Sequence, residues 1–149
     1  MTEPVCRSAV DLVKHFEGLY LKAYICPAGK PTVGYGSTRD VKMGMTITQA
    51  EADARLSRDL SEAAAAVDRL VKVPITANQR GALASFVFNL GSGSLQSSTL
   101  LRLLNAKASK ESVAEQFDRW VYATVKGVKT QLPGLVKRRA AERALFLTP

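Results

Sequence analysis

EGLYLKAYICPAGKPTVGYGST, at residues 17–38, combines three chemically capable side chains with a density of helix-breaking residues. Its glycines and prolines interrupt any helix, and residues 30–38 carry the β-branched and aromatic side chains of short strands around a tight turn. Glu17, Cys26 and Thr32 carry the reactive groups. A carboxyl group that faces a second reactive group across a compact hairpin is the arrangement that glycoside hydrolysis requires.

Glu17 is expected at the end of the first helix, on its apolar side. Pro4 can begin that helix and Gly18 can end it. Apolar residues recur along it at three- and four-residue spacing, and Glu17 continues this stripe one turn past Val13. Partial burial and the negative end of the helix dipole both disfavour a carboxylate. Both therefore favour the protonated form that a general acid needs.

Two capping boxes, at residues 48–51 and 76–79, predict the starts of two helices downstream. The helix that begins at the first box runs to Pro74 and spans about 24 residues. We interpret it as a connector between two lobes. The second helix ends at Gly91. We also predict a plain turn at residues 91–94, and helices from Ser97 or Ser98, over residues 111–121 and after Pro133-Gly134.

These motifs resemble the phage-type lysozymes (endolysins) of the T4 lysozyme superfamily. In that family Glu is followed after eight residues by Asp or Cys, and after five more by Thr. Glu17, Cys26 and Thr32 meet this spacing, and they match the subgroup that has Cys at the second position. The resemblance continues in the family's order through TVGYGST (32–38), SFVFNLG (85–91), residues 98–101, Asn105, LPGLVKRR (132–139) and residues 142–146.

The resemblance implies an α+β fold that is mostly helical and forms a single lysozyme domain over residues 1–149. In it, a small N-terminal lobe with a short β-sheet (about 14–50) is joined by a long helix (about 48–72) to a helical lobe (about 74–149), which also takes up the N-terminal helix.

The resemblance also implies hydrolysis of the β-1,4 bond between N-acetylmuramic acid and N-acetylglucosamine in peptidoglycan. Glu17 is then the general acid, Cys26 the second catalytic group and Thr32 the residue that positions water. Phe88 and Asn89 resemble positions that line the family's cleft. Two alternatives stay open: a lytic transglycosylase, which also needs one acidic Glu, and a non-catalytic peptidoglycan-binding module.

Cys26 makes the expected chemistry depend on pH. An unshifted thiol has a pKa of about 8.5, so little of it is thiolate at neutral pH. Unless the surroundings lower this pKa, activity should rise with pH above neutrality. Cys26 can act as a charge that stabilises the oxocarbenium ion or as a nucleophile. We expect no disulfide with Cys6, which lies far from Glu17 along the same predicted helix.

The composition narrows the class of partner. A net charge of +8 over 149 residues indicates an anionic partner or serves solubility alone. We expect no nucleic acid, because no recognition motif or row of stacking aromatic residues accompanies the charge. One histidine and two cysteines give no metal-ligand cluster. We therefore predict no metal and no cofactor.

The sequence also predicts where the chain acts. It has no long apolar run and no signal peptide, so we expect no stable membrane insertion and synthesis in the host cytoplasm. By the resemblance, the chain would reach the cell wall after holin-type release. We expect it to act as a monomer.

Overall fold

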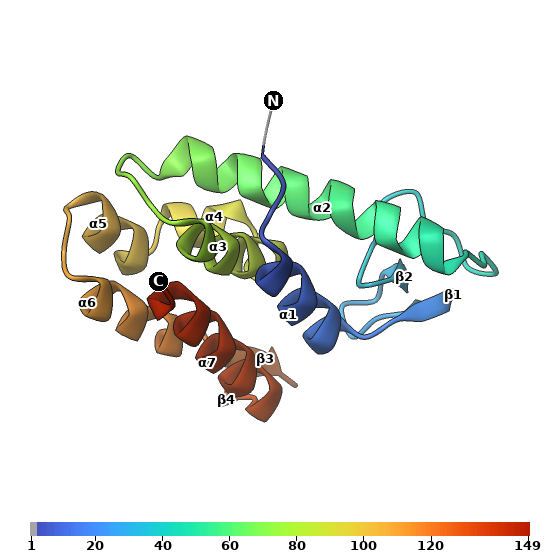
Figure 1. The fold of residues 1–149 in the computed structure, drawn as a ribbon. Coiled ribbons are helices and arrows are strands. Elements are labelled where there is room, and N and C mark those ends of the chain that lie inside the picture. Colours follow the sequence, from blue (N-terminus) through green and yellow to red (C-terminus); the bar gives the residue numbers. More distant parts are fainter. Residues whose placement is uncertain (1–2) are drawn as a thin grey trace.

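The computed structural model describes residues 3–149 as a mainly helical chain with two small antiparallel sheets (Figure 1). The α-helices are α1 (Arg7–Glu17), α2 (Gln49–Leu70), α3 (Ala77–Leu90), α4 (Ser92–Gln96), α5 (Thr99–Asn105), α6 (Lys110–Glu115) and α7 (Pro133–Leu147). A 3₁₀ helix, η1 (Gln116–Arg119), follows α6. The strands are β1 (Tyr20–Ile25), β2 (Pro31–Gly34), β3 (Tyr122–Val125) and β4 (Val128–Gln131). The predicted α+β class is confirmed.

Two buried apolar clusters form the core, and helix α2 contributes to both. Leu56 and Leu60 belong to the smaller cluster, together with residues of α1 and of the β1–β2 region. Ala63 and Val67, farther along α2, belong to the larger cluster, which also includes α3, α5, α6 and α7. In Figure 1, α2 runs from the β1–β2 hairpin at one end of the molecule past the helices at the other. The exact lobe boundaries stay a prediction, which this pair of clusters supports.

Both predicted capping boxes are present and fix the starts of α2 and α3. The Thr48 hydroxyl accepts from the Glu51 amide at 3.1 Å, and the Glu51 carboxylate accepts from the Thr48 amide at 3.2 Å. Thr76 and Gln79 repeat the arrangement at α3. Helix α2 has 22 residues, close to the predicted length.

The predicted start of the first helix is wrong. Helix α1 begins at Arg7, not at Pro4, and Cys6 before it is extended, with φ −61° and ψ 152°. The Pro4 carbonyl accepts a hydrogen bond from Arg80 of α3 at 3.3 Å, and Val5 packs against both apolar clusters. These tertiary contacts outweigh the helix-starting preference of proline.

Residues 91–94 are not a plain turn, because α4 begins at Ser92. The side chain of Leu95, in α4, is fully buried in the larger cluster. Its burial offsets the weak helix propensity of the glycine and serine residues around it.

The helix predicted over residues 111–121 is shorter than expected. It becomes a 3₁₀ turn after Glu115, and the hairpin of β3 and β4 follows, which the sequence analysis missed. Lys126 and Gly127 form its turn, with φ of 51° and 78°. These positive angles suit a two-residue hairpin loop.

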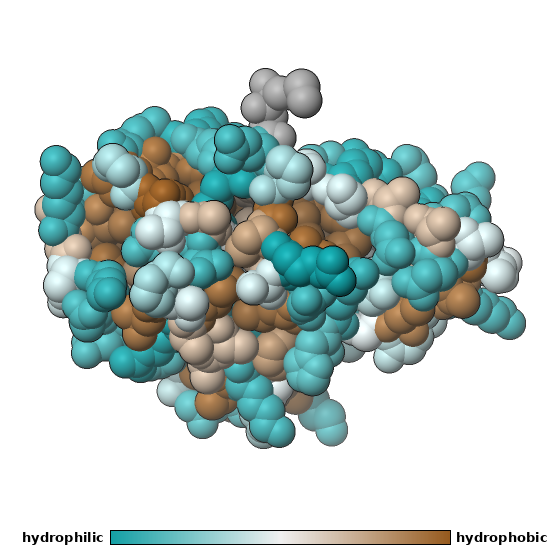
Figure 2. Space-filling model, in the orientation of Figure 1, coloured by the Kyte–Doolittle hydropathy of each residue, from teal (hydrophilic) through white to brown (hydrophobic). Residues whose placement is uncertain are grey.

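Polar side chains cover most of the face shown in Figure 2, and some apolar surface lies over the β1 region. There Leu21 and Ile25 are 40% and 52% exposed. Within residues 3–149, no helix has both the length and the apolar character that crossing a membrane would require.

Candidate active site

Glu17 is the last residue of α1, and its two carboxylate oxygens have different surroundings. Oε2 accepts a hydrogen bond from Nη1 of Arg138 in α7 at 2.5 Å. Oε1 lies against the bare Cα of Gly36, since a Cβ added there would come within 2.6 Å of it. No other residue between 3 and 149 donates a hydrogen bond to this carboxylate. One oxygen is therefore held by a guanidinium, and the other accepts no hydrogen bond from residues 3–149.

The surroundings of Glu17 agree with the prediction in burial but differ from it in charge. The side chain is 21% exposed, which agrees with the predicted partial burial. However, the expected apolar wall includes a positive charge, because the Arg138 side chain is only 4% exposed and points at the carboxylate. The sequence analysis did not include this charge, which comes from a helix 121 positions away along the chain.

The β1–β2 hairpin brings Cys26 and Thr32 together. Tyr24 pairs with Thr32 across the two strands, and Cys26 follows directly after β1. The Cys26 amide donates to the Lys30 carbonyl at 3.0 Å, which closes the turn. The Thr32 hydroxyl donates to the same carbonyl at 2.9 Å. One carbonyl oxygen thus fixes the positions of both residues.

The surroundings of Cys26 favour its thiolate. Hydrogen bonding by the Thr32 side chain, and next by the backbone at Lys30, lowers the pKa of the Cys26 thiol. The Thr32 hydroxyl has a single proton, so it rotates away from the Lys30 carbonyl when it donates to the sulfur. The local lowering that the sequence analysis left open is thus provided by hydrogen bonds and not by a nearby charge.

Tyr24 is a further residue of this site that the sequence analysis missed. Burial, followed by the neighbouring Tyr20, Cys26 and Glu17, raises the pKa of its phenol. Glu17 and Cys26 therefore both lie close enough to act on the same ring. The Tyr20 and Tyr24 rings also pack on each other, with centroids 4.4 Å apart. Tyr24 belongs to the pattern that carries the family resemblance, but the sequence gave it no chemical role, because tyrosine is an ordinary strand residue.

A buried ionic network holds Arg138 in place. Glu142 of α7, which is fully buried, accepts from Arg138 at 3.4 Å and from Arg139 at 2.6 Å. The Ser85 hydroxyl of α3 also donates to it, at 2.5 Å. Burial raises the pKa of Glu142, and the two guanidinium groups oppose that rise. The network joins α3 and α7 behind Glu17.

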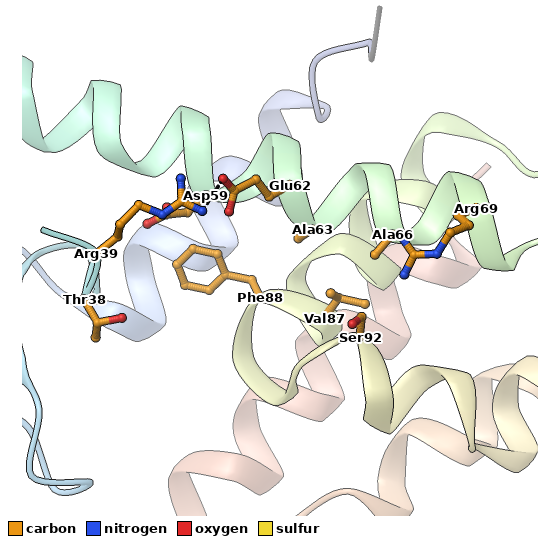
Figure 3. A pocket seen from close by; sticks show the side chains of 11 residues that line it. Thr38, Arg39, Asp59, Glu62, Ala63, Ala66, Arg69, Val87, Phe88 and Ser92 are labelled. Carbon is orange, nitrogen blue, oxygen red and sulfur yellow. Dashed lines mark ion pairs between the residues drawn. The ribbon is translucent and has the colours of Figure 1, made fainter.

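Phe88 and Asn89 have different positions at the end of α3. Phe88 lines a cavity of about 430 Å³ (Figure 3). Gly36, which lies against the Glu17 carboxylate, also lines it. The Asn89 side-chain carbonyl accepts a hydrogen bond from Arg139, so it belongs to the ionic network. Asn89 does not line that cavity.

Cys6 and Cys26 are both free thiols, as predicted. Cys6 lies at the other end of α1, where its thiol donates to the Asn78 side chain at 3.7 Å. Over residues 3–149, no group of three or more His, Cys, Asp and Glu side chains is placed to hold a metal ion.

The sequence and the structure are both similar to known proteins. The family model described as Phage lysozyme matches residues 14–142. An endolysin of Acyrthosiphon pisum secondary endosymbiont phage 1 is 47% identical over 142 residues, which are 95% of this chain and 97% of that protein.

Two solved structures are similar over nearly their whole length. The muramidase domain of SpmX from Asticaccaulis excentricus has a TM-score of 0.91 and 40% identity, covering 97% of this chain and 98% of that one. A lysozyme mutant of phage P22 has a TM-score of 0.85 and 36% identity, covering 98% and 99%.

Gly36→Ala should displace the Glu17 carboxylate and lower cell-wall lysis by at least about a hundredfold. The new Cβ would lie 2.6 Å from Oε1, and the φ of +77° adds backbone strain. Gly44→Ala is the matched control, because Gly44 has a φ of +90° but nothing within 4 Å. Equal activity of the two variants, with both folded, would contradict the contact between Gly36 and Glu17.

Thr32→Val should raise the pKa of the Cys26 thiol, because it removes a donor that stabilises the thiolate. The thiolate fraction at neutral pH then falls, and the rising limb of the pH–rate profile moves to higher pH. The measurement is the rate of alkylation of Cys26 against pH in a Cys6→Ser background. Thr32→Ser keeps the hydroxyl and should behave like the parent. An unchanged titration in Thr32→Val would show that the hydroxyl does not act on the sulfur.

Proposed function

The chain belongs to the phage lysozyme family, and from that premise we propose that Glu17, Cys26 and Thr32 cut the bond between N-acetylmuramic acid and N-acetylglucosamine. Family membership makes it a glycoside hydrolase, a muramidase that lyses peptidoglycan. The assignment of residues and of the bond rests on one observation above all. Glu17 has one oxygen held by Arg138, and the other lies against Gly36, a residue that lines the neighbouring cavity.

In the proposed reaction, the protonated Glu17 donates its proton to the glycosidic oxygen through Oε1. Arg138 keeps the other oxygen fixed, so the carboxyl cannot rotate away from the substrate. A fixed donor lowers the entropic cost of reaching the transition state. Bond breaking leaves positive charge on the sugar ring, as in other glycosidases.

Cys26 and Thr32 act on the opposite side of the sugar. The Thr32 hydroxyl donates its proton to the Cys26 thiolate, and its oxygen keeps its lone pairs for a hydrogen bond from a water molecule. The Cys26 thiolate stabilises the cationic sugar and takes a proton from that water as it adds to the anomeric carbon. Solvent then returns a proton to Glu17 and removes one from Cys26. This single displacement inverts the anomeric configuration, whereas attack by the thiolate itself would retain it.

The substrate cleft is proposed to include Phe88, which lines the cavity beside Gly36. Asn89 has a more indirect role, since Arg139 occupies its carbonyl oxygen. The net charge of +8 suits an acidic wall polymer. We also propose that the chain acts as a monomer and reaches the wall through a holin-type membrane lesion.

Glu17→Gln should abolish wall lysis while the protein keeps its fold, because an amide cannot donate the required proton. The readout is mass spectrometry of digested peptidoglycan, with Gln131→Glu as a folded control on the exposed β4 strand. Wild type should release reducing muramic acid ends. Anhydro ends would identify a lytic transglycosylase, and the absence of products would identify a binding module. Lysis by folded Glu17→Gln protein would remove Glu17 from its proposed role.

A further inference from the structure

The cavity beside Glu17 extends well beyond the reacting centre. One wall is the loop after β2, another is one side of α2, and the third is the end of α3 with the start of α4 (Figure 3). Its volume of about 430 Å³ is that of a typical ligand pocket. Its lining residues are Gly36, Thr38, Arg39, Asp59, Glu62, Ala63, Ala66, Arg69, Val87, Phe88 and Ser92.

Three of the four charged residues in this lining are paired. Arg39 and Glu62 form an ion pair of 2.5 Å across the cavity's near end. Asp59 pairs with Arg58 at 3.2 Å. Arg69, at the far end, has no ion-pair partner among residues 3–149, and Figure 3 shows its guanidinium bent toward the space above Ala66. The cavity therefore has neutralised charges near the reacting centre and one free positive charge at a distance.

The spacing along α2 sets the distance between these two ends. Asp59 and Arg69 are ten residues apart on one continuous helix, which corresponds to about 15 Å. Between them the floor is apolar, formed by Ala63, Ala66 and Val87. A surface of this length has room for more than one sugar ring between the Gly36 end of the cavity and Arg69.

We propose that Arg69 binds a carboxylate on the peptidoglycan strand, at a muramic acid residue away from the bond that is cut. This inference rests on the proposed function. In such a strand every second sugar carries a lactyl–peptide branch, so acidic groups recur at a distance from the reacting bond. An arginine fork matches a carboxylate with two parallel hydrogen bonds. The paired Asp59 and Glu62 repel an acid at the near end less than free carboxylates would.

Arg69 also lies in the last turn of α2, where a cation interacts favourably with the helix dipole. That role affects the stability of the protein and does not distinguish one substrate from another. Substrate discrimination therefore separates a binding role of Arg69 from a purely structural one.

The test compares two soluble peptidoglycan strands of equal length, one with free carboxylates and one whose carboxyl groups are converted to methyl amides. Wild type should have a lower KM for the acidic strands. Arg69→Gln should raise that KM about fivefold, the size expected for losing one partly exposed ion pair, with kcat unchanged. On the amidated strands, Arg69→Gln should match wild type.

Arg102→Gln is the matched control, because Arg102 also lies in the last turn of a helix and is exposed outside the cavity. It should leave both KM values unchanged. The proposal is overturned if Arg69→Gln keeps the preference for acidic strands, or if it weakens both substrates equally. Failure of wild type to cut either strand would overturn the proposed function itself, and the inference with it.

Discussion

A carboxylate buried between two arginines holds the active-site side of this molecule together. As whole residues, Glu142 and Arg139 have no solvent-exposed surface, and Arg138 is 3% exposed. Charged groups removed from water are tolerated only when they are paired and hydrogen-bonded. The network meets most of this requirement within α7 and through Ser85 and Asn89 of α3. The exception is Nε of Arg139, which is buried and has no hydrogen-bond partner among residues 3–149. A buried ion pair of this kind adds little net stability, but removal of one partner leaves an uncompensated buried charge and is strongly destabilising.

The same constraint determines where the candidate acid lies. Arg138 is fixed on one side by Glu142 and extends on the other to Glu17, so α7 fixes the end of α1. The rest of the site comes from the β1–β2 region, which belongs to the smaller apolar cluster. Gly36 brings that region against the Glu17 carboxylate, since any side chain at this position would collide with it. The candidate site is thus assembled from the end of α1, helix α7 and the β1–β2 region.

Much of the fold follows from local sequence, and most of the network behind the site does not. The capping boxes at α2 and α3 depend on residues three apart, so the sequence predicts them directly. The apolar stripe of α1 likewise placed Glu17 at its partly buried end. The Lys126-Gly127 turn was predictable in the same way but was missed, although a glycine-containing pair between two valines is a hairpin pattern.

Contacts between residues far apart in the sequence explain the remaining differences between the predicted and the observed structure. Burial of Leu95 stabilises α4 in a segment rich in glycine and serine. Pro4 does not begin α1, and its carbonyl instead accepts a hydrogen bond from Arg80. Arg139 and Glu142 are three residues apart on α7, so helix geometry alone puts them on the same side. Sequence spacing contained no information that their neighbour Arg138 would meet Glu17 from 121 positions away. Tyr24 was missed for a similar reason, because only the folded hairpin brings its ring near both reactive groups.

The most direct test of this account is the turnover of Glu142→Gln, measured on peptidoglycan well below its melting temperature. Arg143→Gln is the control on the same helix, since Arg143 forms only an exposed ion pair with Asp118. If Glu142 positions Glu17 through Arg138, the folded Glu142→Gln protein should lose kcat by at least about tenfold, with little change in KM. Arg143→Gln should retain the wild-type kcat. A folded Glu142→Gln protein with wild-type kcat would contradict the claim that the buried network positions the catalytic acid.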